Sequence, residues 1–410
     1  MLRTIPLSVY YITIARMLLA FGYTMSYVFI PVYLYQIKHL SAGIVGTITG
    51  LSTLFGLTGW IPASTLIQKL GEKKLMVYSF LIRAFNFLFI GCIIYFDLNY
   101  FFLIPFLLLN SFLMGISVSP MESFLLNMTD HNNRNIAVSI HRTGMNIGWA
   151  FGPFIGGILA EKHFALPFAG TFFLTLAAVI LIFFKIHSEE SKPSNSKKYI
   201  SFQSLKIFLS NKLFLFFSIN SLNLFILMSL LITPLSVFLT GHYNISKTDL
   251  GKLYLLNGLM VGFLQIPISL WFKNLYFSIQ TGLALYFIGY LSIGIFAEMN
   301  FFHQLLYISI IIITLGEILS VSPVHTVSSF FAKENSQLED SILNGYVSSF
   351  IGFIRSFGWS IGPIIAGWIQ DWFHSPLLIW LLSASFGIIG ILVFQILFYF
   401  NPSRFNNSNT

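Results

Sequence analysis

Charged residues and cysteines are scarce in this chain, and both shortages limit what it can be. Lys, Arg, Asp and Glu make up 9% of the 410 residues, whereas a soluble domain has roughly 25%. Hydrophobic residues make up 56%, and the mean hydropathy is +0.80. A lipid bilayer is the solvent that suits such a chain. The single cysteine, Cys92, excludes a disulfide framework and a cysteine-built metal cluster.

Motifs of catalysis and of nucleotide binding are also missing. The sequence has no HExxH, no pair of intramembrane aspartates and no Ser/His arrangement of the kind a hydrolase needs. It has no GxxxxGK loop either, so ATP is not the direct energy source. We therefore expect no enzyme, no catalytic residues, no metal and no cofactor.

Long apolar stretches fill most of the sequence instead. A helix needs about 20 apolar residues to cross a hydrocarbon core of about 30 Å. Such stretches predict an all-α membrane protein with twelve spans, at 8–36, 43–67, 75–96, 100–127, 136–160, 165–185, 213–239, 250–272, 276–297, 301–331, 343–369 and 375–399.

Basic residues beside the spans predict the orientation, because Lys and Arg stay on the cytoplasmic side during insertion. With the N-terminus inside, the cytoplasmic set runs from Arg3 to Arg404 and far outnumbers the outside set of Lys38, Lys162, Lys247 and Lys252. We expect a multi-pass protein of the cell membrane with both termini in the cytoplasm. The net charge of +8 reflects this bias and does not indicate nucleic-acid binding.

The two halves of the sequence echo each other. GWAFGPFIGG at 148–157 returns as GWSIGPIIAG at 358–367, and SVSP at 117–120 returns at 320–323. Ser41 and Gly46 have counterparts in Ser246 and Gly251, and Pro31 has one in Pro234. A duplicated membrane-embedded half is typical of a transporter, since two similar bundles that rock against each other open a central site to either side in turn.

A polar segment separates these halves. It contains SEESKPSNSKK, a composition typical of a solvated linker. We therefore divide the chain into an N-terminal six-helix bundle at 1–187, a cytoplasmic linker at 188–212, a C-terminal six-helix bundle at 213–400 and a cytoplasmic tail at 401–410.

Function is expected to concentrate in the few ionisable groups at membrane depth, because each costs about 2.5–3.5 kcal/mol to insert. Counting along the helices at about 1.5 Å per residue places Glu317 and Arg355 near the midplane. The same count gives a cytoplasmic layer made of Arg16, Glu122, Arg142 and His325. Arg83 is a further buried candidate.

The repeat relates Glu122 to His325, which lie 203 residues apart like the two SVSP segments. Equivalent positions face each other across a pseudo-twofold axis, so this acid and this imidazole would pair when the cytoplasmic side closes. The strength of such a pair depends on protonation. The alternative is that each bonds within its own half, Glu122 with Arg16 or Arg142.

Glu317 is the candidate for coupling, either as a proton site or as the counter-charge of a cationic substrate. Its alternative role is a structural ion pair with Arg355, which lies on the same ridge of its helix as Gly358 and Gly362.

Substrate contacts are predicted on the first and seventh spans. Tyr23 and Tyr27 share a helix face with Arg16, and Asn220 shares one with Asn223. Aromatic rings together with the acid Glu317 suit a lipophilic or cationic compound. Packing or interfacial anchoring is the alternative role of these side chains.

The fifth-span motif carries a resemblance to a known family. Gly148, Gly152, Pro153, Gly156 and Gly157 match GxxxGPxxGG, and the copy in the eleventh span keeps Gly358, Gly362, Pro363 and Gly367. Glycines four apart let helices approach closely, so a packing ridge is one role of this motif. On these residues the chain resembles the major facilitator superfamily over nearly its full length, and in particular the drug and proton antiporters. The resemblance implies two pseudo-symmetric six-helix bundles, with the first and seventh helices lining a central cavity.

A second pattern of that family, in the loop after the second span, is only partly present. Lys69, Gly71 and the pair Lys73-Lys74 match it, but Gln68 replaces the expected acid and Ser64 the first glycine. The acid normally makes charge-assisted contacts that hold the inner gate. Because Gln68 replaces this acid, the loop does not predict the contacts that usually hold the inner gate in that family.

Together these features predict a secondary transporter that uses alternating access, most simply a proton-coupled exporter of small lipophilic or cationic compounds. The alternatives are a proton-coupled uptake symporter for a sugar, organic acid or other small metabolite and, more remotely, a non-transporting receptor on the same fold. The expected partners are a small-molecule substrate, protons or another coupling ion, and the lipid bilayer. A monomer is expected, because one pair of bundles is a complete translocation unit.

Overall fold

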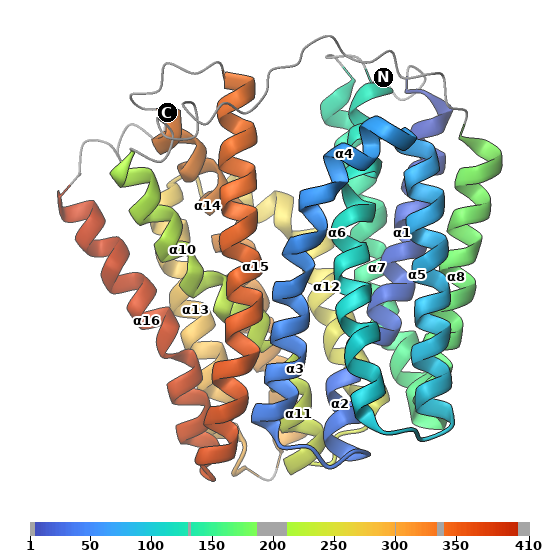
Figure 1. Cartoon of the computed structure of the whole chain (residues 1–410). Coiled ribbons are helices and arrows are strands. Elements are labelled where there is room, and N and C mark those ends of the chain that lie inside the picture. The colour runs from blue at the N-terminus through green and yellow to red at the C-terminus, as the bar shows by residue number, and fades with distance from the viewer. Residues whose placement is uncertain (1–4, 130–132, 187–210, 300, 334–339, 401–410) are drawn as a thin grey trace. The chain divides into compact units, whose positions relative to one another are not determined.

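The computed structural model describes residues 5–129, 133–186, 211–299, 301–333 and 340–400, and every regular element in these ranges is a helix. Of the predicted linker at 188–212 only Asn211 and Lys212 fall among the described residues, and the predicted tail at 401–410 lies outside them. The N-terminal helices (Figure 1) are α1 (Leu7–Tyr27), α2 (Ile30–Gln36), α3 (Ala42–Phe55), α4 (Trp60–Leu70), α5 (Glu72–Tyr95), α6 (Leu103–Asn127), α7 (Arg134–Lys162) and α8 (Ala165–Lys185). After the linker follow α10 (Lys212–Leu230), α11 (Thr233–His242), α12 (Lys247–Trp271), α13 (Leu275–Phe296), α14 (Phe302–Lys333), α15 (Asp340–Trp372) and α16 (Pro376–Phe400). Two short 3₁₀ turns are η2 (Gly56–Gly59) and η3 (Tyr100–Phe102).

These helices confirm the all-helical, membrane-spanning fold class that the apolar stretches predict. Among the described residues, 11 helical segments are long and apolar enough to cross a membrane. α7 covers the predicted fifth span as a 29-residue helix, although it is not one of those segments.

Three predicted spans consist of two helices in line. α1 gives way to α2 at residues 28–29, and Pro31 occupies the second position of α2. α10 gives way to α11 at residues 231–232, and Pro234 occupies the second position of α11. Proline lacks an N–H and its ring clashes with the preceding turn, so it is tolerated at a helix start but breaks a helix interior. The third case is α3 and α4, which η2 joins.

Packing divides the chain into two compact units. Unit 1 comprises Met1–Leu40, Leu51–Asn195 and Ser236–Gly262, and unit 2 comprises Ser41–Gly50, Ser196–Leu235 and Phe263–Thr410. Each unit therefore includes a stretch from the other half of the sequence. The start of α3 packs in unit 2, and the start of α12 packs in unit 1. The division into bundles at the linker stays a prediction.

In unit 1, α1 packs against α7 and α8, and α5 packs against α6 and α8 (Figure 1). One hydrophobic cluster joins these five helices through side chains such as Ile12, Met76, Phe124, Ala137 and Ile182. In unit 2, α10 packs against α15 and α16, and α13 packs against α14 and α16. The same pairing of first and fifth long helices thus occurs in each half of the sequence.

Glycines of the fifth-span motif explain the contact between α7 and α1. A Cβ at Gly148 would lie 2.6 Å from the backbone nitrogen of Phe21. One at Gly152 would overlap the Thr24 hydroxyl, and one at Gly156 would overlap the carbonyl of Met25. Glycines four apart therefore form the face of α7 on which the backbone of α1 rests.

The opposite face of α7 carries the start of α12 in the same way. A Cβ at Gly251 would lie 2.6 Å from the carbonyl oxygen of Pro153, and one at Gly258 would lie 2.6 Å from the Cα of Ala150. A Cβ at Gly157 would overlap the carbonyl of Lys247. The motif therefore packs one helix against two others.

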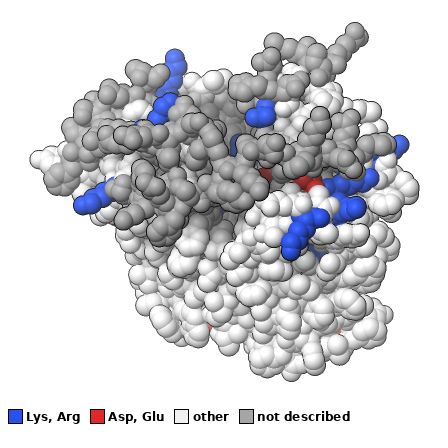
Figure 2. Space-filling model, turned by 45° about the horizontal axis from the view of Figure 1, so that its top comes forward, with Lys and Arg blue, Asp and Glu red and all other residues white. Residues whose placement is uncertain are grey.

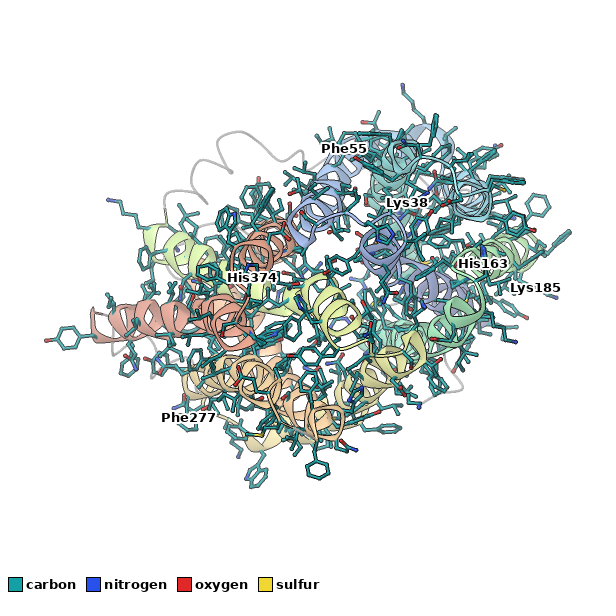
Figure 3. The ribbon with its side chains drawn as sticks, turned by 90° about the horizontal axis from the view of Figure 1, so that it is seen from below. Lys38, Phe55, His163, Lys185, Phe277 and His374 are labelled. Atoms are coloured by element: carbon teal, nitrogen blue, oxygen red, sulfur yellow. The ribbon has the colours of Figure 1, made fainter. Side chains whose placement is uncertain are left out.

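Outward-facing side chains of both units are strongly apolar. Phe55 and Phe277, labelled in Figure 3, have 43% and 58% of their surface exposed. Among the described residues visible in Figure 2, most are neither acidic nor basic. Exposed apolar surface on this scale suits contact with lipid chains.

A pair of glycine substitutions tests the role of the motif. Gly152→Ala places a methyl group against Thr24 and Phe21, and such overpacking costs about 1–3 kcal/mol. Gly262→Ala is the matched control, since a Cβ there meets nothing within 4 Å and alanine favours a helix by up to about 1 kcal/mol. We expect the Tm in detergent to fall for Gly152→Ala and to hold or rise for Gly262→Ala. An equal effect of the two substitutions would contradict this account of the packing.

Candidate functional site

A buried guanidinium group lies inside unit 1. Arg83, on α5, keeps 5% of its surface exposed. Its Nε donates a hydrogen bond of 2.9 Å to Oδ1 of Asn110 on the neighbouring helix α6. Its Nη2 is buried and has no hydrogen-bond partner among the described residues. Asn110 is neutral, so this cation is held without a bonded counter-charge.

Aromatic rings pack around that guanidinium group. The Arg83 Cζ lies 5.1 Å from the ring centroid of Tyr23 and 5.5 Å from that of Phe87. Such cation–π contacts compensate for part of the lost hydration. Tyr23 stacks on Tyr27 with 4.7 Å between ring centroids, and it meets Trp149 of α7 edge-on at 6.2 Å.

This polar-aromatic cluster draws on five helices of unit 1. Its members are Tyr23 and Tyr27 of α1, Thr53 of α3, Arg83 of α5, Asn110 of α6 and Trp149 of α7. The Tyr27 and Thr53 hydroxyls lie 3.5 Å apart. The glycine face of α7 sets its geometry, because it brings Trp149 next to the ring of Tyr23. The two tyrosines and the tryptophan are only partly buried, so their rings offer a platform for an apolar ligand.

In the predicted cytoplasmic layer of unit 1, the hydrogen bonding of Arg16 is incomplete among the described residues. Arg16 Nη2 donates to the Met145 sulfur at 3.2 Å, and Arg16 Nε is buried without a partner. Arg16 and Glu122 attract each other electrostatically, but no hydrogen bond or ion pair joins these two described residues. His141, which the sequence analysis did not single out, is buried nearby with an unpartnered Nδ1.

Two gating predictions from the sequence stay open. The side chain of Arg142 is exposed, as is that of Glu122. Glu122 belongs to unit 1 and His325 to unit 2, and the hypothesis that they pair stays a prediction.

Glu317 lies beside an aromatic stack in unit 2. It is partly exposed on α14 and lies within electrostatic range of Tyr286 on α13. Tyr286 stacks on Tyr290 with 6.1 Å between centroids, and Tyr290 stacks on Trp380 of α16 at 5.5 Å. The side chain of Arg355 on α15 is exposed, and its pairing with Glu317 stays a prediction.

The two asparagines of the seventh span contact each other. Asn223 Nδ2 donates to Asn220 Oδ1 at 3.0 Å, and Asn220 Nδ2 donates to the carbonyl of Gly390 on α16 at 3.2 Å. Asn220 is 5% exposed, whereas Asn223 is partly buried. Asn220 therefore joins α10 to α16, and a substrate contact by either asparagine stays a prediction.

The loop motif after the second span contains a buried acid that the sequence analysis missed. Glu72 is 8% exposed, and its Oε1 accepts hydrogen bonds from the Ser123 hydroxyl and from Asn127 Nδ2, the latter at 2.7 Å. Gly71 precedes it with φ 77° and ψ 159°, which a residue with a side chain rarely adopts. An acid four residues after Gln68 therefore ties α5 to α6. Its position inside the expected motif, directly after the glycine, was the available signal.

Comparison with known proteins identifies the family. The sequence profile described as Major Facilitator Superfamily matches residues 12–338. The chain therefore belongs to the major facilitator superfamily, and it is a membrane transporter and not an enzyme. This confirms the family resemblance, whereas the antiporter subtype stays a prediction.

Individual relatives are distant. The chain is 24% identical over 176 residues to the uncharacterized MFS-type transporter YqjV of Bacillus subtilis strain 168, a match that spans 42% of each chain. Crystal structures share the fold at low identity. The nucleoside transporter NupG gives a TM-score of 0.78 at 13% identity, covering 95% of this chain and 99% of that one. An inward-facing, occupied bacterial homologue of the human lysosomal transporter Spinster gives 0.78 at 13% identity, covering 97% of both chains.

Removing the amide that binds Arg83 tests the account of this cluster. Asn110→Ala leaves the Arg83 Nε without its partner, and an unsatisfied buried donor of this kind costs about 1–3 kcal/mol. We expect a lower Tm for Asn110→Ala and no further loss when the same change is made in an Arg83→Met background. Equal losses in both backgrounds would show that the Asn110 amide supports something other than Arg83.

Proposed function

We propose that this transporter works by alternating access and exchanges protons for small lipophilic compounds that carry an acidic group or another hydrogen-bond acceptor. The observation that carries the proposal is the buried, unmatched charge of Arg83. The direction of export rests on the fifth-span motif, and the location in the cell membrane rests on the distribution of basic residues.

The cost of Arg83 supports a ligand with an acceptor group. An arginine at membrane depth costs about 2.5–3.5 kcal/mol, and the Asn110 amide satisfies one of its five N–H groups. A packed apolar side chain would avoid this cost. We therefore assign Arg83 a role in substrate binding, since a carboxylate or carbonyl of a substrate would complete its hydrogen bonds through charge-assisted contacts.

A cationic substrate fits this cluster poorly. The guanidinium group of Arg83 already lies over the ring of Tyr23. Arg16 lies close enough to Arg83 to repel it electrostatically, so a further cation would meet two positive charges. Of the two substrate classes that the sequence predicts, we therefore keep the lipophilic one, for which the rings of Tyr23, Tyr27 and Trp149 supply apolar contact.

Proton coupling is assigned to Glu317. It is an acid that remains partly exposed on a helix of the predicted second bundle. It lies beside the aromatic stack of Tyr286 and Tyr290, and a carboxyl group is able to bind and release a proton. Glu122 and His325 remain the proposed inner pair.

The buried charge of Arg83 also favours a second candidate function, the uptake of an organic acid together with protons. Arg83 and Arg16 lie in one unit and suit an acid, and uptake would use the same site as export. The direction of the driving gradient distinguishes the two candidates. In proteoliposomes, an acidic lumen drives substrate uptake by an antiporter, whereas an acidic exterior drives uptake by a symporter.

Matched ligands test the substrate class. A lipophilic carboxylic acid, its amide and the amine of the same skeleton are compared by thermal shift at two pH values. We expect the acid to raise the Tm most and the amine least, because a carboxylate makes charge-assisted contacts with Arg83, an amide offers only a neutral acceptor and an ammonium group offers none. The response to the acid should vanish in Arg83→Met and persist in Arg134→Met, which removes an exposed arginine at the start of α7. A stronger response to the amine, or an acid response that survives in Arg83→Met, would refute the assignment.

Glu317→Gln tests the coupling. The substitution removes the titratable proton and keeps the shape of the side chain. In proteoliposomes with an imposed pH gradient we expect uphill flux to disappear while downhill exchange continues. Undiminished uphill flux would exclude Glu317 as the coupling site.

A further inference from the structure

A carboxylate at the end of α15 caps a helix from the opposite half of the sequence. Asp371 accepts a hydrogen bond of 2.6 Å from the Ser41 hydroxyl, and bonds of 2.9 Å from the backbone nitrogens of Ala42 and Gly43. Ala42 and Gly43 are the first residues of α3 and Ser41 directly precedes them, and both segments belong to unit 2. The first backbone N–H groups of a helix have no partner within the helix, and they favour a negative charge. Asp371 therefore supplies what α3 lacks.

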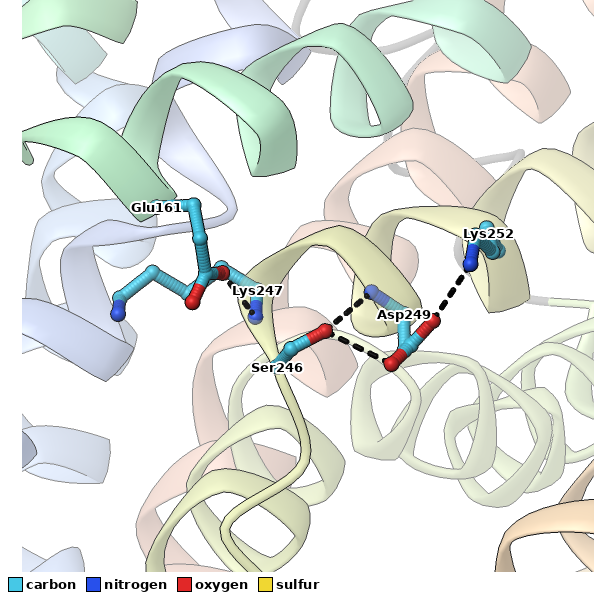
Figure 4. Close-up of polar contacts among 5 residues, drawn as sticks. All are labelled: Glu161, Ser246, Lys247, Asp249 and Lys252. Carbon is cyan, nitrogen blue, oxygen red and sulfur yellow. Dashed lines mark hydrogen bonds and ion pairs between the residues drawn. The ribbon is translucent and has the colours of Figure 1, made fainter.

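The same contact is built a second time in unit 1. Glu161, at the end of α7, accepts a hydrogen bond of 2.9 Å from the backbone nitrogen of Lys247, the first residue of α12 (Figure 4). Glu161 and Asp371 lie 210 residues apart, as do Gly148 and Gly358, so the repeat makes them equivalent. Their partners are equivalent too, since Ala42 and Lys247 lie 205 residues apart like Ser41 and Ser246.

The two copies differ in how much they depend on this carboxylate. α12 has a cap of its own, because the Ser246 hydroxyl accepts from the Asp249 nitrogen at 3.0 Å and donates to the Asp249 carboxylate at 2.8 Å (Figure 4). The residue of α3 that corresponds to Asp249 is Ile44, which offers no carboxylate. α3 keeps the serine part of this cap, since the Ser41 hydroxyl accepts a hydrogen bond of 3.4 Å from the Ile44 nitrogen. It lacks the carboxylate part, so Asp371 supplies the acid at the start of α3, whereas the start of α12 has Asp249 in addition to Glu161.

Close packing extends the Asp371 contact along both helices. The Ser360 hydroxyl donates to the carbonyl of Gly50 at 2.8 Å, and Trp368 Nε1 donates to the Thr47 hydroxyl at 3.3 Å. Ser360 is 1% exposed. α3 and α15 therefore separate only if these bonds and the Asp371 cap break together.

We infer that Asp371 and Glu161 are paired latches that hold the outer end of the transport path closed, and that Asp371 is the stronger of the two. The inference rests on the proposed alternating access, in which the halves of the chain separate at one end at a time. The predicted orientation puts this end outside, because Lys38, Lys162 and Lys247 belong to the outer set. Each latch is a carboxylate cap that exists only while the two helices touch, so opening leaves the backbone nitrogens of Ala42 and Gly43 without their acceptor.

A buried reporter cysteine tests the inference without a substrate. In a Cys92→Ser background, Ser360→Cys places a thiol where α3 covers α15, and a membrane-impermeant maleimide measures how often that contact opens. We expect Asp371→Asn to raise the labelling rate about tenfold, because the loss of one charge-assisted contact shifts an opening equilibrium by about that factor. We expect Glu161→Gln to raise the rate about twofold or less. An unchanged rate in Asp371→Asn would overturn the inference.

A second variant separates a latch from a simple helix cap. Asp371→Asn combined with Ile44→Asp gives α3 the internal capping acid that α12 has in Asp249. We expect this double variant to recover the parent Tm while its labelling stays fast, since a cap within α3 does not reach α15. Labelling that returns to the parent rate would mean that Asp371 is only a cap, and it would overturn the inference. If labelling depends on Asp371 but proteoliposomes show no uphill flux, the latch stands and the proposed coupled transport fails.

Discussion

The close approach of helices through glycine is the constraint on which this structure depends. Lipid surrounds the helices with apolar solvent, so burial of apolar side chains does not by itself hold them together. Gly148, Gly152 and Gly156 let the backbone of α1 rest on α7, close enough for the Thr24 hydroxyl to donate to the carbonyl of Gly148 at 3.2 Å. The contact fixes the position of Trp149 relative to Tyr23, and through Tyr23 the surroundings of Arg83. The opposite face of the same helix receives α12, so one motif positions both the aromatic cluster and the contact between Glu161 and Lys247.

The scarce charges then divide the molecule by function. Arg83 is stabilised by aromatic faces and a single amide, which leaves part of its hydrogen-bonding capacity for a ligand. Glu72 joins α5 to α6, because its Oε1 accepts hydrogen bonds from two side chains of α6. Asp371 bonds to the start of α3, a helix from the other half of the sequence. These three charges therefore differ most clearly in the partners that packing gives them.

Duplication explains both the symmetry and its exceptions. The two copies of the GPxxG helix pack on the first long helix of their own half and on the second long helix of the other half. Each copy ends in an acid that caps this second helix. The copies have diverged where the Asp249 carboxylate accepts from the Ser246 hydroxyl and the equivalent Ile44 has no acceptor. The two copies of the contact therefore differ in how many carboxylates they contain, although the repeat makes their positions equivalent.

The sequence alone determined the helices, because spans of about 20 apolar residues and prolines such as Pro31 and Pro234 act through local physical constraints. The family followed as well, since GxxxGPxxGG at 148–157 is a local pattern whose spacing fixes one helix face. Neither Asn110 as the partner of Arg83 nor Asp371 as the cap of α3 was foreseen. Asn110 belongs to the next helix, and Asp371 is separated from Ala42 by 329 residues. Such contacts arise only when helices pack, because a side chain meets residues distant in sequence through tertiary geometry and not through periodicity. The sequence therefore determined which residues share a helix face, and the tertiary structure decided which side chains contact the charged groups.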